Sequence, residues 1–265
     1  MTSSLTNLQQ RVLSAVVLAA VVLALTWFGG LPFRILTVVM GAGVFVEWRR
    51  ITQSGQKTIL AKAAELLLIL AFAMLLAGFA PQLVFAAIAV ASLAGFAAKF
   101  AGQASIWLGW GILYAGVPAA SLAFLRGDDR AGLIAVFFLF ALVWATDIFA
   151  YFVGRTLGGP KMAPAISPGK TWSGAIGGAT ASVIAGLSVA GFAGLPAGPM
   201  LPVIIALVSA WSQIGDLFES WVKRKFGVKD SGTIIPGHGG IMDRVDALAA
   251  AAAALYLIHM LTGLF

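Results

Sequence analysis

The 265-residue sequence contains no cysteine and few charged residues. Without cysteine the chain can form no disulfide framework, and no thiolate can act as a nucleophile or metal ligand. Only 10% of the residues are charged, against about 25% in a typical soluble domain. Hydrophobic residues make up 60%, compared with roughly 45–50% in soluble proteins. This composition excludes an ordinary soluble protein and predicts one that is embedded in a membrane.

Long apolar runs recur along the whole chain, and a helix needs about 20 such residues to cross a bilayer core. The predicted spans cover residues 12–29, 31–47, 65–79, 82–98, 105–125, 131–153, 174–193, 201–222 and 245–264. The runs do not alternate with a period of two, as the strands of a membrane barrel would. We therefore predict an all-α, polytopic integral membrane protein with about nine transmembrane helices.

The positive charges are divided unevenly between the two ends of these spans. If the N-terminus is cytoplasmic, 14 of the 17 Lys and Arg residues lie on the cytoplasmic side, and only Arg34, Arg126 and Arg130 do not. Cytoplasmic loops of membrane proteins carry such an excess of Lys and Arg. The pattern predicts that the N-terminus is cytoplasmic. We expect the protein to reside in the cell (inner) membrane.

The two halves of the chain differ in where polar residues occur. Residues 1–130 are predicted to form membrane helices that serve packing, lipid access and dimer contacts. Residues 131–265 carry ionisable groups inside spans and two long cytoplasmic loops, at 154–173 and 223–244, so we predict that this half is catalytic. Both loops lie on the same side of the membrane and can contribute to one site.

Three acids fall within or at the ends of predicted spans: Asp147, Asp216 and Glu219. Burying a charge in a membrane is costly, so each is a candidate functional residue. The alternative is a satisfied contact between helices or a position at the membrane interface. This alternative carries the most weight for Glu219, which lies one turn from the interface.

One face of the eighth span combines an anion, a hydroxyl and a cation. Asp216, Ser220 and Lys223 are spaced i, i+4, i+7, so they line one side of a helix that ends at the cytoplasmic surface. Metal and phosphate would suit such a face. For Arg224 and Lys225, binding of anionic lipid headgroups is an alternative.

The segment "PGHGGIMDRVD" leads into the last span. Backbone N–H groups of Gly239 and Gly240, just before a helix start, can bind an anion. Asp243 and Asp246 follow at i, i+3, and paired carboxylates near a phosphate site are hard-oxygen ligands suited to Mg²⁺. Both could instead cap the helix.

Capping would not explain the neighbouring His238 and Arg244. The alternative for His238 is a loop histidine that is hydrogen-bonded to backbone. His259 lies deep in the last span and is interpreted as structural.

The other loop contains "SPGKTWSG", which looks like the end of a phosphate-binding P-loop. The full pattern needs a Gly five residues before Gly169 and a preceding strand. Position 164 is Pro and the segment follows a membrane helix, so the P-loop is rejected. Lys170, Thr171 and Ser173 remain candidates to hold phosphate at a helix start; for Lys170 the alternative is a plain loop charge.

Together these residues indicate phosphoryl-group chemistry at the membrane face, because metal ions and Lys or Arg neutralise phosphate charge while acids hold the metal. The segment "SWVKRKFGVKDSGTIIPGHGGIMDRVD", residues 220–246, resembles the signature of phosphatidate cytidylyltransferases, or CDP-diacylglycerol synthases. The matching positions are Ser220, Lys223, Arg224, Lys229, Asp230, Gly232, Pro236, His238, Gly239, Gly240, Asp243, Arg244 and Asp246. "DIFAYFVGRTLG" and "SPGKTW" are similar to further segments of that family, which usually has Glu where this chain has Ser173.

The resemblance implies a nucleotidyltransferase that converts CTP and phosphatidate to CDP-diacylglycerol and pyrophosphate in phospholipid biosynthesis. It also implies dependence on Mg²⁺, allows a second, monovalent cation such as K⁺, and implies a homodimer that contacts membrane lipids and no nucleic acid. The predicted catalytic residues are Asp216, Asp246, Lys223 and His238. The predicted residues for substrate phosphate are Lys170, Thr171, Ser220, Arg224, Gly239, Gly240 and Arg244. The predicted metal ligands are Asp216, Asp243 and Asp246.

The sequence disfavours two other classes of membrane protein. A CDP-alcohol phosphatidyltransferase would resemble the pattern D-G-x-x-A-R…G-x-x-x-D-x-x-x-D, which this sequence does not contain. A transporter or channel would need acids spread along the depth of the bilayer, whereas these acids mostly gather at one face. No internal repeat is visible either, which further weakens a transporter built from inverted repeats.

Overall fold

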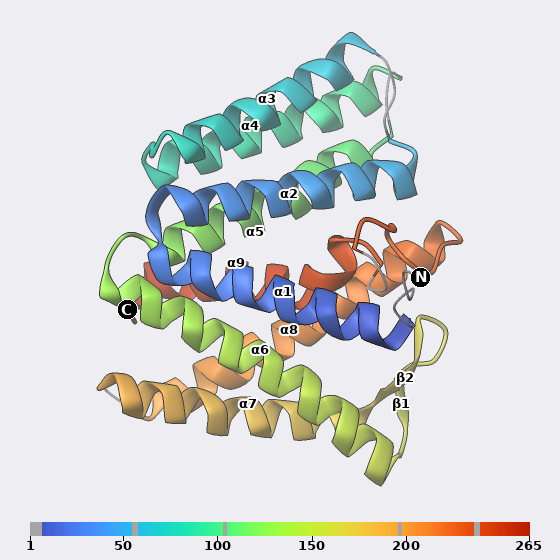
Figure 1. The fold of residues 1–265 in the computed structure, drawn as a ribbon. Coiled ribbons are helices and arrows are strands. Elements are labelled where there is room, and N and C mark those ends of the chain that lie inside the picture. Colours follow the sequence, from blue (N-terminus) through green and yellow to red (C-terminus); the bar gives the residue numbers. More distant parts are fainter. Residues whose placement is uncertain (1–6, 55–57, 103–104, 196–197, 236–238) are drawn as a thin grey trace, which may run out of the picture. The chain divides into compact units, whose positions relative to one another are not determined.

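The computed structural model describes residues 7–54, 58–102, 105–195, 198–235 and 239–265, with side chains from residue 12 onward. Within these residues the chain is almost entirely helical (Figure 1). The helices are α1 (Asn7–Phe28), α2 (Gly30–Thr52), α3 (Ile59–Leu76), α4 (Pro81–Phe100), α5 (Trp107–Arg126), α6 (Arg130–Leu157), α7 (Trp172–Ala193), α8 (Met200–Lys225) and α9 (Met242–Thr262). The prediction of an all-α fold is confirmed.

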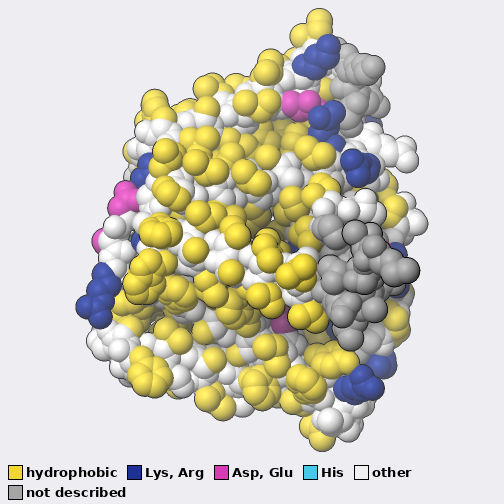
Figure 2. Space-filling view, viewed as in Figure 1, with side chains coloured by type: hydrophobic (Ala, Val, Ile, Leu, Met, Phe, Trp, Pro, Cys, Tyr) yellow, Lys and Arg dark blue, Asp and Glu magenta, His cyan; other side chains and the backbone are white. Residues whose placement is uncertain are grey.

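Eight of the helices in the described part of the chain, α2 to α9, are long and apolar enough to cross a membrane. In α1 the apolar stretch Val12–Phe28 is shorter. Large hydrophobic side chains are exposed on these helices, up to 94% for Phe192. On the face drawn in Figure 2, hydrophobic side chains cover most of the surface. Such a surface suits lipid rather than water, and the protein is integral to a membrane. The count of nine spans and the side of the N-terminus stay predictions.

The loop predicted at 154–173 contains a short β-hairpin. Strands β1 (Lys161–Ala163) and β2 (Ser167–Thr171) pair antiparallel, with Lys161 opposite Thr171 and Ala163 opposite Ser167. The hairpin joins the end of α6 to the start of α7. The sequence analysis did not predict it, because two strands this short leave no alternating pattern to detect.

The chain divides into two compact units. The first comprises residues 1–128 and 228–244, and the second comprises residues 129–227 and 245–265. The first break lies close to the boundary at 130 predicted from the sequence. The segment 228–244, predicted to belong with the catalytic half, is part of the first unit because its backbone is hydrogen-bonded to α2.

In the first unit, small residues let the helices approach closely, which is typical of packing in membranes. A Cβ atom at Gly95 of α4 would come within 2.9 Å of the Gly109 backbone of α5. Trp48 of α2 is fully buried and packs over Gly111 of α5. Its indole N–H donates to the Trp107 carbonyl at 2.7 Å, so its polar atom is satisfied.

In the second unit, α6 and α7 lie side by side (Figure 1). The buried stripe of α7 consists of Gly174, Gly178, Ser182, Gly186 and Ala190. A Cβ atom at Gly174 would lie 2.6 Å from the Ala150 carbonyl oxygen of α6, and one at Gly178 would lie 2.6 Å from that of Thr146. Only glycine permits this separation. Thr146 also forms a 2.7 Å hydrogen bond with Ser209, which ties α6 to α8.

Candidate active site

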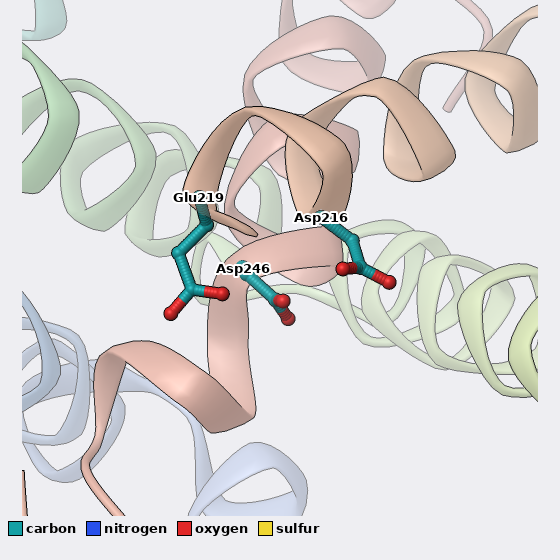
Figure 3. A group of neighbouring side chains, drawn as sticks. All are labelled: Asp216, Glu219 and Asp246. Atoms are coloured by element: carbon teal, nitrogen blue, oxygen red, sulfur yellow. The ribbon is translucent and has the colours of Figure 1, made fainter. Parts of the chain in front are cut away.

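Three carboxylates of the second unit gather at one point. Asp216 and Glu219 come from α8, at i, i+3, and Asp246 comes from α9; one oxygen of each lies within 4.8 Å of the others. Figure 3 shows the side chains of Asp216 and Glu219 on either side of Asp246. Gly215 allows this arrangement, because a Cβ atom there would overlap Ala250 and lie 3.0 Å from the Asp246 carbonyl oxygen. The close approach of α8 and α9 at Gly215 therefore brings the acids together.

Two lysines are paired with this group. The Lys170 ammonium lies 2.6 Å from Asp216 Oδ2, and the Lys223 ammonium lies 3.0 Å from Glu219 Oε2. The Ser220 hydroxyl is 3.5 Å from Asp216 Oδ1, at the limit of a hydrogen bond. Asp216, Ser220 and Lys223 all lie on α8, where Lys223 pairs with Glu219.

The acids of this group differ in how they are paired. Asp147 of α6 interacts electrostatically with Asp216, Asp246 and Lys170. Among the described residues, Asp216 and Glu219 each pair with a lysine, whereas Asp147 and Asp246 form no ion pair. Glu219 is 1% exposed, and its Oε1 has no hydrogen-bond partner in the described part of the chain. A carboxylate oxygen without a donor beside a second carboxylate is a position that a cation would satisfy.

The donor set fits Mg²⁺ in kind and nearly in size. Mg²⁺ binds oxygens at about 2.1 Å, so opposite ligands lie about 4.2 Å apart. The carboxylate oxygens span up to 4.8 Å. A bound ion would draw them slightly inward or keep waters between itself and one of them.

A pocket of about 640 Å³ opens beside the acids, within the second unit. Asp147, Tyr151 and Arg155 line it from one face of α6, and the hairpin, the start of α7 and the middle of α8 complete the wall. The polar residues around it are Asp147, Tyr151, Arg155, Lys161, Ser167, Lys170, Thr171, Gln213 and Asp216. It combines cationic and acidic side chains, which suits a phosphate-bearing ligand held with a metal ion.

The hairpin residues have defined local roles. Thr171 is buried and caps α7, its hydroxyl accepting from Gly174 N–H at 3.1 Å. The Ser173 hydroxyl donates to the Gly158 carbonyl, so the residue at the usual glutamate position ties α7 to the end of α6. Arg224 donates to the Ile166 carbonyl at 3.4 Å. Lys170 is the hairpin residue whose charged group reaches the acids.

The remaining predicted residues belong to the first unit. Asp243 Oδ2 accepts from Gly240 N–H at 2.9 Å and from Ser231 N–H at 2.8 Å, so the structure places this carboxylate in a cap. Gly239 has a positive φ of 83°, and the Arg244 side chain is exposed. His238 lies outside the described residues. Phosphate or metal binding by Gly239, Gly240, Asp243 and Arg244 stays a prediction, as does a catalytic role of His238.

Sequence reasoning underrated one acid and missed another. Glu219 was interpreted mainly as an interfacial residue, although its i, i+3 spacing from Asp216 was a usable signal. Glu47 of α2 is not among the predicted site residues, yet it is fully buried and hydrogen-bonded to the backbone of the 228–244 segment. Nothing local in the sequence links residues so far apart in the chain.

Residues 9–262 match the Cytidylyltransferase family. A phosphatidate cytidylyltransferase of Brucella abortus biovar 1 (strain 9-941) is 47% identical over 264 residues, covering 96% of this chain and 93% of the relative. One of Bacillus subtilis (strain 168) is 32% identical over 274 residues, covering 95% and 97%. One of Haemophilus influenzae (strain ATCC 51907 / DSM 11121 / KW20 / Rd) is 43% identical over 145 residues, covering 52% and 49%.

Proposed function

The chain belongs to the cytidylyltransferase family, and from this premise we propose that it transfers the cytidylyl group of CTP to phosphatidate. The products are CDP-diacylglycerol and pyrophosphate, and the reaction serves phospholipid biosynthesis. The observation that carries the proposal is the match of nearly the whole chain to phosphatidate cytidylyltransferases. The acidic group with its lysines and adjoining pocket supplies a site of the required chemistry.

The reaction is a single displacement at phosphorus. An oxygen of the phosphatidate phosphate forms a bond to the α-phosphorus of CTP. The bond from that phosphorus to the oxygen bridging to the β-phosphate breaks, and pyrophosphate leaves with the electron pair. The attacking oxygen is already anionic, so the step needs positioning and charge neutralisation more than a general base.

The residues of the second unit divide these tasks between them. Lys170 reaches both the pocket and Asp216, so its ammonium can leave the carboxylate and bind a substrate phosphate. Lys223 holds Glu219 at 3.0 Å and places a second positive charge beside the acids. Arg155 and Lys161 line the pocket and add positive charge to it. This distribution favours a triphosphate lying along the pocket toward Asp216.

We propose Mg²⁺ as the cofactor, held by Asp216, Glu219 and Asp246. When bound, it would neutralise phosphate charge and polarise the phosphorus under attack. The support is the grouping of three carboxylates, of which Asp246 forms no ion pair in the described part of the chain, and the buried Glu219 Oε1 that has no partner among the described residues. The ligand set differs from that predicted from the sequence in containing Glu219, while Asp243 stays a predicted ligand.

We further propose that the site faces the cytoplasm of a cell whose inner membrane holds the protein. The 14-to-3 division of Lys and Arg supports this orientation, and CTP is a cytoplasmic nucleotide. A homodimer, as the resemblance implies, belongs to the same proposal. The phosphatidate acyl chains would remain in the lipid beside the apolar helices.

The test is turnover by the purified protein in detergent. CTP and phosphatidate are supplied with Mg²⁺, and CDP-diacylglycerol and pyrophosphate are both measured. We expect equal amounts of the two products, and none when EDTA removes the metal. If CDP-diacylglycerol is instead consumed when an alcohol such as glycerol 3-phosphate is added, the protein is a CDP-alcohol phosphatidyltransferase and the proposal is wrong.

A further inference from the structure

Glu47 is a fully buried carboxylate in the half of the chain to which the sequence analysis assigned no chemistry. It lies near the end of α2 and is 0% exposed. In the described part of the chain no ion pair to it is found. An isolated charge in such a place is costly unless hydrogen bonds stabilise it. Its partners therefore indicate why it is there.

Those partners come from the segment that leads into α9. Glu47 Oε1 accepts from Ile241 N–H at 2.9 Å, and Oε2 accepts from Met242 N–H at 2.8 Å and lies 2.8 Å from the Ser231 hydroxyl. The first N–H groups of a helix have no partner within the helix and carry a partial positive charge. A carboxylate from α2, 194 residues earlier, therefore caps the start of α9.

The glycines of this segment leave room for the carboxylate. A Cβ atom at Gly232 would lie 2.8 Å from Glu47 Oε1, and one at Gly240 would overlap both the Ser231 hydroxyl and Glu47 Oε2. The Gly240 N–H is already used by Asp243. Gly240, which was predicted to bind phosphate, and Gly232 thus have a steric reason to be glycine, which is the close packing of an acid from another helix.

We propose that Glu47 is a positioning residue for the reaction: it fixes the residue at which α9 begins. Asp246 lies in the next turn of that helix and is one of the three grouped acids. If the first turn frays, Asp246 leaves its helical conformation and the acidic group loses a member. The inference rests on the proposed function for its effect on turnover, while the anchoring itself can be measured without any substrate.

The experiment compares Glu47→Gln with a matched control, Glu65→Gln. Glu65 is a carboxylate of α3 in the same unit and is paired with Arg49 at 3.2 Å. Among the described residues it forms no hydrogen bond or ion pair with the 228–244 segment. In Glu47→Gln the side-chain NH₂ group replaces one carboxylate oxygen. The backbone N–H of either Ile241 or Met242 therefore loses its acceptor. Hydrogen–deuterium exchange of peptides covering residues 239–250 is measured in detergent, together with turnover at several Mg²⁺ concentrations.

We expect at least about tenfold faster exchange at the start of α9 in Glu47→Gln, with exchange in α3 to α5 unchanged. Turnover should fall about tenfold, and half-maximal activity should need more Mg²⁺. Glu65→Gln should leave exchange at 239–250 as in the unaltered protein. If Glu47→Gln does not fold, Ser231→Ala removes one hydroxyl partner of Glu47 and should produce the same exchange change in weaker form.

Several results would overturn the inference. Exchange at 239–250 that is unchanged in Glu47→Gln or, where that variant does not fold, in Ser231→Ala shows that Glu47 does not anchor α9. Faster exchange with full turnover shows that the anchor does not serve the reaction. An unaltered protein with no turnover of CTP and phosphatidate counts against the proposed function instead, and the exchange comparison still decides the anchor.

Discussion

Both units of the molecule contain a group of carboxylates at the ends of helices, and the two groups differ in what surrounds them. In the first unit, Glu47 and Asp243 are met by backbone N–H groups and by a serine hydroxyl. In the second, Asp216 and Glu219 are met by lysines, Asp246 adds a third acid, and one Glu219 oxygen has no partner among the described residues.

The difference lies in how the negative charge is satisfied. Fixed N–H donors at a helix start stabilise a carboxylate permanently and leave little capacity for a ligand. Flexible lysines and an oxygen without a donor leave a group that can exchange its partners for a metal ion and a phosphate. The number and kind of donors, rather than burial alone, separates the structural acids from those suited to the reaction.

The sharpest test of this comparison replaces an acid of the second group. Asp246→Asn and Asp216→Asn keep nearly the same shape but remove a charge that Mg²⁺ needs. We expect each to lower turnover by at least about a hundredfold, which is the scale of losing a principal electrostatic contact to the transition state. Thermal melting of both variants should stay near that of the unaltered protein. Turnover is measured against Mg²⁺ concentration for each variant.

A contrary result is easy to recognise. If Asp246→Asn retains full turnover with unchanged Mg²⁺ dependence, then the metal lies elsewhere and the acidic group is structural. The comparison between the two units would then have no functional meaning.

A smaller effect is expected from Lys170→Ala. Lys170 pairs with Asp216 and lines the pocket, so its loss removes one charge-assisted contact to phosphate. Such a contact is worth about 1.5–3 kcal/mol, which corresponds to about tenfold or more in turnover. Steady-state kinetics for both substrates provide the measurement, and Lys62→Ala, at an exposed lysine of α3 that does not line the pocket, is the control, with a change below about threefold. Unchanged kinetics in Lys170→Ala would show that Lys170 is a charged loop residue that does not bind substrate phosphate.

The smallest effect on the reaction is expected from Asp243→Asn. Asn still caps helices well, although Ser231 and Gly240 would lose a charged acceptor. We expect a loss of about 1 kcal/mol in stability, seen as a melting temperature lower by roughly 2–4 °C. The Mg²⁺ concentration for half-maximal turnover should hardly change. A phenotype like that of Asp246→Asn would instead support the metal role predicted from the sequence, and the contrast between the two units would narrow.

Much of the fold could be predicted because each membrane helix is determined by the apolar residues of its own segment. The run 105–125 was predicted and α5 spans Trp107–Arg126, since apolar length alone sets such a helix. The short third run was predicted at 65–79, whereas α3 spans Ile59–Leu76. There Lys62 interrupted the apolar run and obscured the start of the helix, which Thr58 caps through Ala61 N–H.

Only those parts of the site whose residues lie close together in the sequence could be predicted. Asp216, Ser220 and Lys223 were identified from helical spacing, and Asp246 from its loop. The pairing of Lys170 with Asp216 depends on how the hairpin returns to α8, and no spacing rule contains that information. The contact of Glu47 with the start of α9 is of the same kind, because it depends on tertiary packing across most of the chain.

The close packing of α7 on α6 also has a consequence for how the protein folds while it is being synthesised. Most of the wall of the pocket comes from α6, the hairpin and the start of α7, which are consecutive in the chain. Contacts between neighbouring segments close short loops and form early, and membrane helices associate once they are inserted. The α6–hairpin–α7 pair can therefore assemble while α8 and α9 are still being synthesised. The acids on those later helices then reach a binding wall that is already formed.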